Sequence, residues 1–217
     1  MDHCSWLPLL VHQGFTGEIF CSNPTMAIAK LILLDSAKIQ EDEAKKANYE
    51  KYSKHEVAKP LYTVEQAEKV FELFHVVKTN ESISLTGAVT AKFTNAGHNI
   101  GACTIEVSCE NKILVFSGDI GRDNDVLMFP PTKPKKASYV FLESTYGDRI
   151  HPDVNAKAEL EIEINTAFEK GGTVIIPSFA VERAQGVMYL LWQLKLEGKI
   201  PDIPYIIDSP MKRKLYF

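Results

Sequence analysis

The chain has 217 residues, 45% of them apolar, so it is long enough to bury a core and to form one or two domains. Its formal net charge of −4 excludes a generic basic protein that holds nucleic acid by charge alone. No apolar run approaches the ~20 residues of a membrane span, and the amino terminus lacks the charged-then-apolar order of a signal peptide.

The cysteines and the basic clusters add little specific chemistry. None of the cysteines forms a Cys-x-x-Cys pair, which argues against a structural zinc knuckle and favours a reducing compartment, so we expect a cytoplasmic protein. Two short basic clusters are interpreted as solvated loops or faces. The cysteines are Cys4, Cys21, Cys103 and Cys109, and the clusters are Lys133, Lys135 and Lys136, and Lys212, Arg213 and Lys214.

The amino-terminal part has the spacing and capping residues of helices. A short helix is predicted at 5–12, followed by a strand at 18–21. Asn23 is expected to cap a long helix that has Pro24 at its first position. That helix continues into the charged run 41–51, which should face solvent.

A second helix is predicted by the capping box that Thr63 and Gln66 form, and it carries an apolar face. Further along the chain the period changes to that of strands. The strand at 103–108 alternates apolar and polar residues, so one of its faces should be wet. Glu110 and Asn111 have the character of a hairpin turn. The predicted strands are 83–86, 88–93, 103–108, 112–117 and 138–142.

After Arg149 the pattern becomes an alternation of helix and strand. This order indicates a parallel sheet with right-handed crossovers. We therefore expect two α/β domains, 1–150 and 151–217. The elements predicted in the second domain are helices at 155–170 and 181–197 and strands at 173–177 and 203–207.

Three polar side chains, His98, Asp119 and Glu143, stand just past or at the ends of strand-like runs, each with glycine nearby. A sheet fixes its strand ends while the loops beyond them are free to present side chains, so these groups can converge. An imidazole and a carboxylate suit a zinc-like ion, but two ligands do not complete a site. Taken singly, His98 is as well explained as a satisfied loop histidine, Asp119 as a turn residue and Glu143 as a partner of Arg149.

Residues 2–10, taken together with these three side chains, make a resemblance to a known protein family specific. The chain resembles the beta-CASP group of metallo-β-lactamase-fold nucleases, an RNA-processing family. Alone, Asp2 and His3 would be interpreted as an unstructured terminus. The matching runs are Asp2-His3 with residues 4–10, Ala-Gly-His-x-x-Gly-Ala at 96–102, Ser117 to Asp119, Glu143 to Gly147, Ile176 to Gln185 and Asp208 to Met211.

The resemblance implies a partial metallo-β-lactamase αββα sandwich followed by the start of an α/β beta-CASP domain with parallel strands. It implies two zinc ions in the complete protein, with Asp2 and His3 as ligands of one, His98 of the other, and Asp119 bridging them. Asp2 would also orient the attacking hydroxide, and Glu143 would hold a histidine that protonates the leaving oxygen.

The implied reaction is zinc-dependent hydrolysis of RNA phosphodiester bonds by endonuclease action, with 5′ exonuclease action left open beside it. The family's first two metal histidines would precede Met1, and two more would follow Phe217. We therefore expect a fragment lacking both ends, inactive or nearly so by itself, from an active parent protein.

Other classes of function stay open at this point. A non-catalytic scaffold paralogue of an RNA-processing complex would keep the fold and lose the metals. A small-molecule hydrolase of the metallo-β-lactamase fold would not be expected to carry the α/β segment after Glu143. A DNA-directed relative is a fourth reading. The remaining histidines are interpreted as surface or packing residues; they are His12, His55, His75 and His151.

Overall fold

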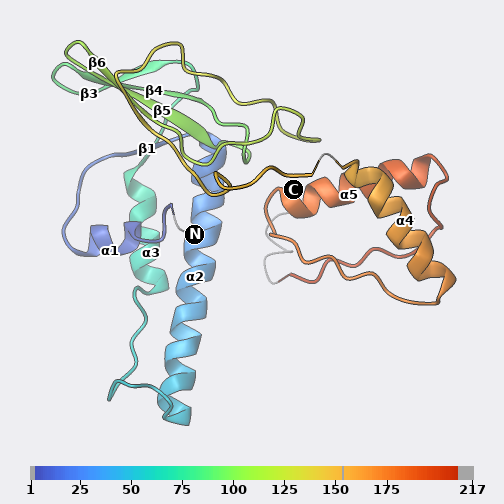
Figure 1. Cartoon of the computed structure of the whole chain (residues 1–217). Helices are drawn as coiled ribbons and strands as arrows, with labels where there is room; N and C mark the ends of the chain where they lie inside the picture. The colour runs from blue at the N-terminus through green and yellow to red at the C-terminus, as the bar shows by residue number, and fades with distance from the viewer. Residues whose placement is uncertain (1–2, 153, 210–217) are drawn as a thin grey trace.

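The structure is a computed structural model that describes residues 3–152 and 154–209. The larger of two sheets has five strands. Figure 1 shows this sheet at one end, helices α1 to α3 beneath it, and α4 and α5 beside these layers. The elements are α1 (Leu7–His12), β1 (Ile19–Cys21), α2 (Asn23–Glu50), α3 (Val64–Val70), the 3-10 turn Phe71–Leu73, β2 (Phe74–Val76), β3 (Ser82–Thr86), β4 (Val89–Asn95), β5 (Cys103–Cys109), β6 (Lys112–Phe116), β7 (Tyr139–Phe141), α4 (Ala156–Glu169) and α5 (Arg183–Leu196).

Helix α2 is the longest helix of the helical layer. With 28 residues it is roughly 42 Å long, so it extends well beyond the sheet (Figure 1). Its buried side chains Leu33 and Ala37 are spaced by one helical turn and pack against α3. The cap of α2 is Ser22 and not the predicted Asn23, because Ser22 is extended and its hydroxyl oxygen accepts the backbone N–H of Thr25 at 3.2 Å.

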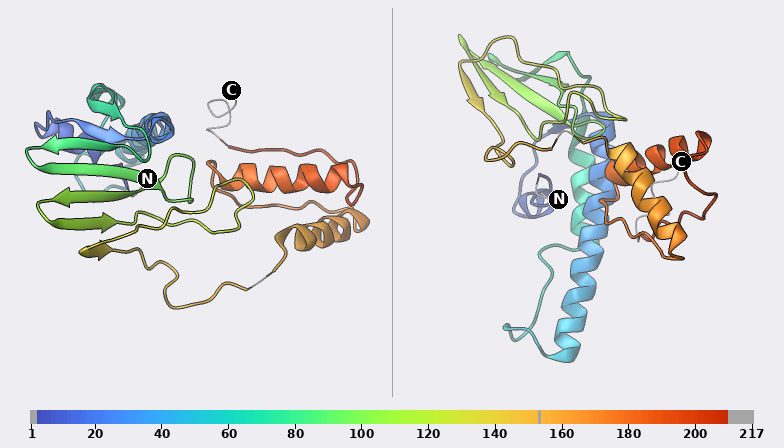
Figure 2. Two further views of the ribbon diagram at one scale, coloured as in Figure 1. Left: turned by 90° about the horizontal axis from the view of Figure 1, so that it is seen from above. Right: turned by 45° about the vertical axis from the view of Figure 1, so that its right-hand side comes forward.

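Helix α3 begins where the sequence predicts. The hydroxyl of Thr63 accepts the backbone N–H of Gln66, and the side chain of Gln66 accepts the backbone N–H of Thr63, which completes the capping box. Ala67 and Val70 are fully buried against α2 in the first hydrophobic cluster. Both views of Figure 2 keep α2 and α3 side by side.

The five-stranded sheet has the order β3-β4-β5-β6-β7. All five strands predicted between 83 and 142 are confirmed, and the hairpin turn between β5 and β6 falls at Glu110, which has a positive φ of 53°. Neighbouring strands are antiparallel except β6 and β7, which are parallel. Strands β4, β6 and β7 therefore run in one direction, and their carboxyl ends meet at one edge of the sheet.

A second sheet, which the sequence did not reveal, consists of β1 and β2 paired in parallel. A hydrophobic cluster contains Phe20 of β1 together with Phe93 of β4 and Ile105 of β5, so apolar side chains of the two sheets pack together. The predicted wet face of β5 is only partly wet, because Thr104 is buried and its hydroxyl donates to the backbone oxygen of Ser117 at 2.9 Å. The class is α/β, as predicted, with one parallel and one mixed sheet.

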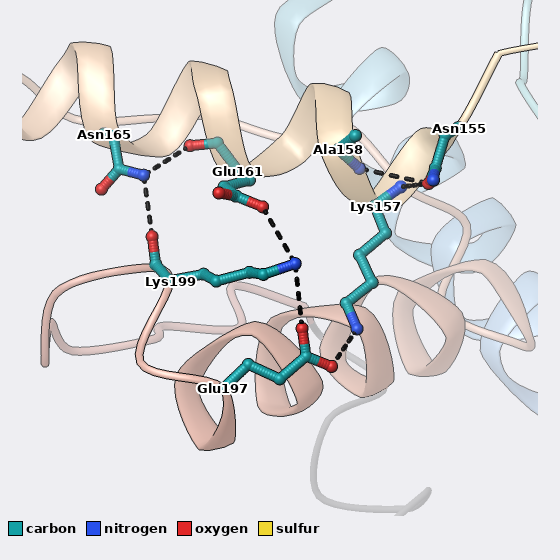
Figure 3. Close-up of polar contacts among 7 residues, drawn as sticks. All are labelled: Asn155, Lys157, Ala158, Glu161, Asn165, Glu197 and Lys199. Carbon is teal, nitrogen blue, oxygen red and sulfur yellow. Dashed lines mark hydrogen bonds and ion pairs between the residues drawn. The ribbon is translucent and has the colours of Figure 1, made fainter.

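The helices predicted at 155–170 and 181–197 are present as α4 and α5. They share a hydrophobic cluster that contains Ile164 and Leu194 and no residue of the other two clusters. Figure 3 shows the polar side of this contact, where Lys199 reaches Glu161 and Glu197, and Glu197 also accepts from Lys157.

The strands predicted at 173–177 and 203–207 are wrong, since neither segment is paired as a strand. Ile175 and Ile206 are each 84% exposed in these segments. An apolar run becomes a strand only when a neighbouring strand accepts and donates its backbone hydrogen bonds, and no strand lies after β7 in the described residues. Among the described residues, 3–152 and 154–209, no helix is long and apolar enough to cross a membrane.

Candidate metal centre

The sheet topology gathers the predicted site residues. His98 lies three residues past β4, Asp119 three past β6 and Glu143 two past β7. Because these three strands run in the same direction, the loops that follow them leave the same edge of the sheet. His3 comes to this edge from a separate direction, from the segment that leads into α1.

Two imidazoles approach one carboxylate oxygen. The Nε2 atom of His3 lies 3.3 Å from Oδ2 of Asp119, and Nε2 of His98 lies 3.6 Å from the same oxygen. The distance of 3.6 Å is too long for a hydrogen bond. All three side chains keep solvent access, between 40 and 59% of each being exposed, so an ion could enter from water.

These separations fit the donor chemistry of zinc. Two ligands of one tetrahedral zinc ion, each bonded at ~2.0–2.1 Å, are about 3.4 Å apart. The pairs His3–Asp119 and His98–Asp119 stand at 3.3 and 3.6 Å, close to that separation. Imidazole nitrogen and carboxylate oxygen are also the donor types that zinc accepts. The residues present therefore fit the metal in kind and in pairwise spacing.

The described residues do not close a complete metal site. Within residues 3–152 and 154–209, no group of three or more His, Cys, Asp and Glu side chains is placed to hold one ion. Each imidazole instead makes a separate pair with Asp119. Asp2, which the sequence predicts as a further ligand, lies outside the described residues.

Backbone contact fixes the two loops against each other. The N–H of Gly121 donates to the carbonyl of Ala96 at 2.9 Å, and a Cβ at Gly121 would fall 1.7 Å from the carbonyl oxygen of Gly97. Gly97 has φ +69°, a conformation that favours glycine. The spacing between His98 and Asp119 is therefore set by main-chain packing.

Glu143 supports the loop of Asp119 from the adjacent strand. Its carboxylate accepts the N–H of Ile120 at 2.9 Å and that of Thr145 at 3.4 Å. The hydrogen bond from Ile120 is the largest cause that lowers the pKa of Glu143 below its usual 4.5, with smaller contributions from Thr145 and from the nearby His98. Its predicted role in holding a further histidine is a separate matter and stays a prediction.

Sequence reasoning missed the part played by Ser117. This buried side chain accepts the N–H of Glu143 at 3.0 Å, while its backbone N–H donates to Phe141 at 2.9 Å. It therefore ties the end of β6 to the end of β7. A serine directly before the Gly-Asp pair was the available signal, but serine in a turn is too common to assign on that ground.

Three of the other histidines have partners away from the candidate centre. His75 lies 3.5 Å from Glu18, His12 lies within 3.0 Å of the amide of Gln66, and His151 stacks edge-on against a tyrosine. Burial raises the pKa of the Cys21 and Cys103 thiols, which disfavours the thiolate form that binds metals.

The fold and this cluster define an α/β protein that gathers histidine and aspartate at one sheet edge. The chain is 32% identical to Ribonuclease TTHA0252 of Thermus thermophilus over 97% of its length. It is 30% identical over 99% to Endoribonuclease ysh1 of Schizosaccharomyces pombe, and 29% identical over 96% to Transcription termination factor FttA of Methanosarcina mazei.

By this similarity the chain belongs to the metallo-β-lactamase/β-CASP family, as its sequence motifs predict. It spans 44% of the Thermus relative and about a third or less of the other two. No family model matches the chain.

Proposed function

We propose that the chain contributes the metal-binding side chains of a zinc-dependent enzyme that hydrolyses RNA phosphodiester bonds. The observation that carries this proposal is the approach of His3 and His98 to the same oxygen of Asp119, at 3.3 and 3.6 Å. A shared carboxylate between two imidazoles is the arrangement expected of an aspartate that bridges two ions. Its relatives include proteins named ribonuclease and endoribonuclease.

Each residue has a distinct part in this proposal. His3 and His98 offer ring nitrogens to separate ions, and Asp119 shares its carboxylate between them. Asp2 is proposed as a further ligand that also orients the attacking hydroxide. Glu143 holds the backbone after Asp119 in place and is proposed to orient a histidine that protonates the leaving oxygen. When bound, a pair of zinc ions lowers the pKa of water and stabilises charge on the attacked phosphate.

An open groove beside the candidate centre supports a nucleic-acid substrate. The groove has a volume of about 260 Å³ and is lined by His3, Trp6 and Leu10 among others. Trp6 is 65% exposed, and an exposed indole is a platform on which a base can stack. With a net charge of −4, this chain would hold RNA by such local contacts more than by overall charge.

Two further points belong to the same proposal. We place a domain boundary near residue 150, because the cluster of α4 and α5 shares no residue with the clusters before it. We also place the protein in the cytoplasm, where Cys21, Cys103 and Cys109 would stay reduced as they are in the structure.

A non-catalytic scaffold is the second candidate function. Loss of metal ligands would be its mark, whereas this chain keeps two imidazoles against Asp119. A small-molecule hydrolase is less well supported, since two of the relatives are named ribonuclease and endoribonuclease. The similarity to them also extends through the α4–α5 segment.

The test is cleavage of end-labelled single-stranded RNA in the presence of zinc, with DNA of the same sequence as a second substrate. The proteins compared are the chain extended at both ends to the length of its relatives, its Asp119→Asn variant and its Glu18→Gln variant. The proposal predicts RNA cleavage that Asp119→Asn abolishes and Glu18→Gln preserves. Zinc binding without cleavage of either nucleic acid would favour the small-molecule reading, and absence of both would favour the scaffold.

A further inference from the structure

The loop that carries His98 is attached to the start of helix α2. The carbonyl oxygen of Gly101 accepts the hydroxyl of Ser22 at 2.7 Å and the hydroxyl of Thr25 at 2.8 Å. The thiol of Cys103 approaches the same oxygen at 3.3 Å. This carbonyl lies three residues after His98. It therefore accepts hydrogen bonds from two hydroxyl groups at the start of α2, more than 70 residues earlier in the chain.

The contact at Gly101 is also close in the steric sense. Gly101 has φ +86°, and a Cβ there would lie 2.6 Å from the hydroxyl oxygen of Ser22 and 2.8 Å from the backbone nitrogen of Thr25. Only glycine allows the loop to approach the helix so closely. Next to it, the N–H of Ala102 donates to the carbonyl of Asn99 at 2.9 Å, which closes the loop on itself.

Helix capping explains only part of the contacts that Ser22 and Thr25 make. Ser22 caps α2 by accepting the N–H of Thr25 at 3.2 Å, and any good cap residue would do that. The hydroxyl of Thr25 has no part in the cap hydrogen bond, yet it donates to Gly101. Each hydroxyl carries one proton, and both oxygens lie closer to the Gly101 carbonyl, at 2.7 and 2.8 Å, than to each other, at 2.9 Å, so we assign both protons to that carbonyl. Both donors are therefore directed at the loop.

Helix α2 is a suitable anchor because its own position is fixed. Leu33 and Ala37 are fully buried in the cluster shared with α3. A loop tied to such a helix has less freedom than one that is tied only to its own strands. We propose that Ser22 and Thr25 are positioning residues that hold the His98 imidazole against Asp119. This inference rests on the proposed metal centre.

The test uses three variants of the whole chain with a matched control. Thr25→Val removes the donated proton with nearly unchanged shape, Ser22→Ala removes cap and donor together, and Thr25→Ser restores the hydroxyl. Thr63→Ala is the control, since it removes a cap of the same kind from α3, where the hydroxyl does not contact Gly101.

Two readouts separate the inference from the metal centre. In metal-free protein, amide exchange at Ala102 should rise by about 2- to 10-fold in Thr25→Val, the effect of one lost hydrogen bond, and return in Thr25→Ser. With zinc alone as the probe, followed through the His98 ring signals in NMR spectra, affinity should fall about 10- to 100-fold in Thr25→Val and in Ser22→Ala. Thr63→Ala should leave both readouts unchanged.

The inference is overturned if Thr25→Val leaves Ala102 exchange and zinc affinity as they are, or if Thr63→Ala changes them as much as Thr25→Val does. If zinc leaves the His98 ring signals of the wild-type chain unchanged, the proposed metal centre is overturned, and the metal-positioning role with it. Faster Ala102 exchange in Thr25→Val would in that case show that the attachment of the loop exists without serving a metal.

Discussion

Replacing Gly121 with alanine tests whether main-chain packing sets the geometry of the candidate centre. The added Cβ would lie 1.7 Å from the carbonyl oxygen of Gly97 and 2.7 Å from the backbone nitrogen of His98. An ordinary contact begins at 3.4 Å, so the two loops must separate by roughly 1.7 Å. Gly121 does not have a positive φ, so the expected effect is steric and not conformational.

The magnitude follows from two losses. The hydrogen bond from Gly121 to the carbonyl of Ala96, now 2.9 Å, would be broken, which costs ~0.5–1.5 kcal/mol. Overpacking adds ~1–3 kcal/mol. The free energy of unfolding should therefore fall by about 1.5–4.5 kcal/mol. Metal sites tolerate deviations of only ~0.2 Å in ligand distance, so displacement of His98 should also abolish measurable zinc binding.

Urea unfolding measures the first effect, and a zinc titration measures the second. Gly172→Ala is the matched control, because its Cβ would meet its nearest neighbour, the carbonyl oxygen of Ala167, at an ordinary 3.4 Å. The reasoning is refuted if Gly121→Ala unfolds at the same urea concentration as the wild type and binds zinc equally well.

Three further predictions concern other parts of the chain. The pKa of Glu143 is lowered in the folded state, so its stabilising hydrogen bond to Ile120 is present above the usual 4.5 and is lost as the pH falls through the lowered value; Glu143→Gln should reduce that loss of stability in acid urea titrations. Trp6→Ala should weaken binding of a fluorescent single-stranded RNA by ~1–3 kcal/mol, and unchanged binding would remove the stacking role. Leu194→Ala should destabilise the α4–α5 unit by ~2–5 kcal/mol and leave amide exchange in β3–β6 unchanged; faster exchange in both parts would contradict a domain boundary near 150.

Local signals in the sequence predicted the local parts of the fold. The capping box of Thr63 and Gln66 needs only residues three apart, and the turn at Glu110 joins strands that are adjacent in sequence. The strands between 83 and 142 were predictable for the same reason, because their pattern lies within each segment, as in the alternation of apolar and polar residues at 103–108.

Long-range contacts could not be predicted in the same way. The choice of Ser22 over Asn23 as the cap reflects its bond to Gly101, which is 79 residues away. The pairing of β1 with β2 joins two three-residue strands that have no distinctive pattern. The error at 173–177 is of the opposite kind, since the local pattern was clear but no described strand lies beside the segment to accept its hydrogen bonds.

The candidate site was predictable in its members and not in its geometry. His98 and Asp119 could be selected as polar residues at strand ends, and His3 through a resemblance. The parallel pairing of β6 with β7, and the antiparallel pairs before it, decide that these ends meet at one edge. The close approach of Gly121 to Gly97 depends on backbone coordinates alone.

The most direct test of the account is a zinc titration followed through the ring signals of the six histidines by NMR, which detects weak binding as well as tight binding. The account predicts that zinc shifts the signals of His3 and His98 and not those of His75. Asp119→Ala should abolish these shifts, while Glu18→Ala, which removes the carboxylate 3.5 Å from His75, should leave them in place. Unmoved signals of His3 and His98, or shifts that survive Asp119→Ala, would contradict a metal centre built around Asp119.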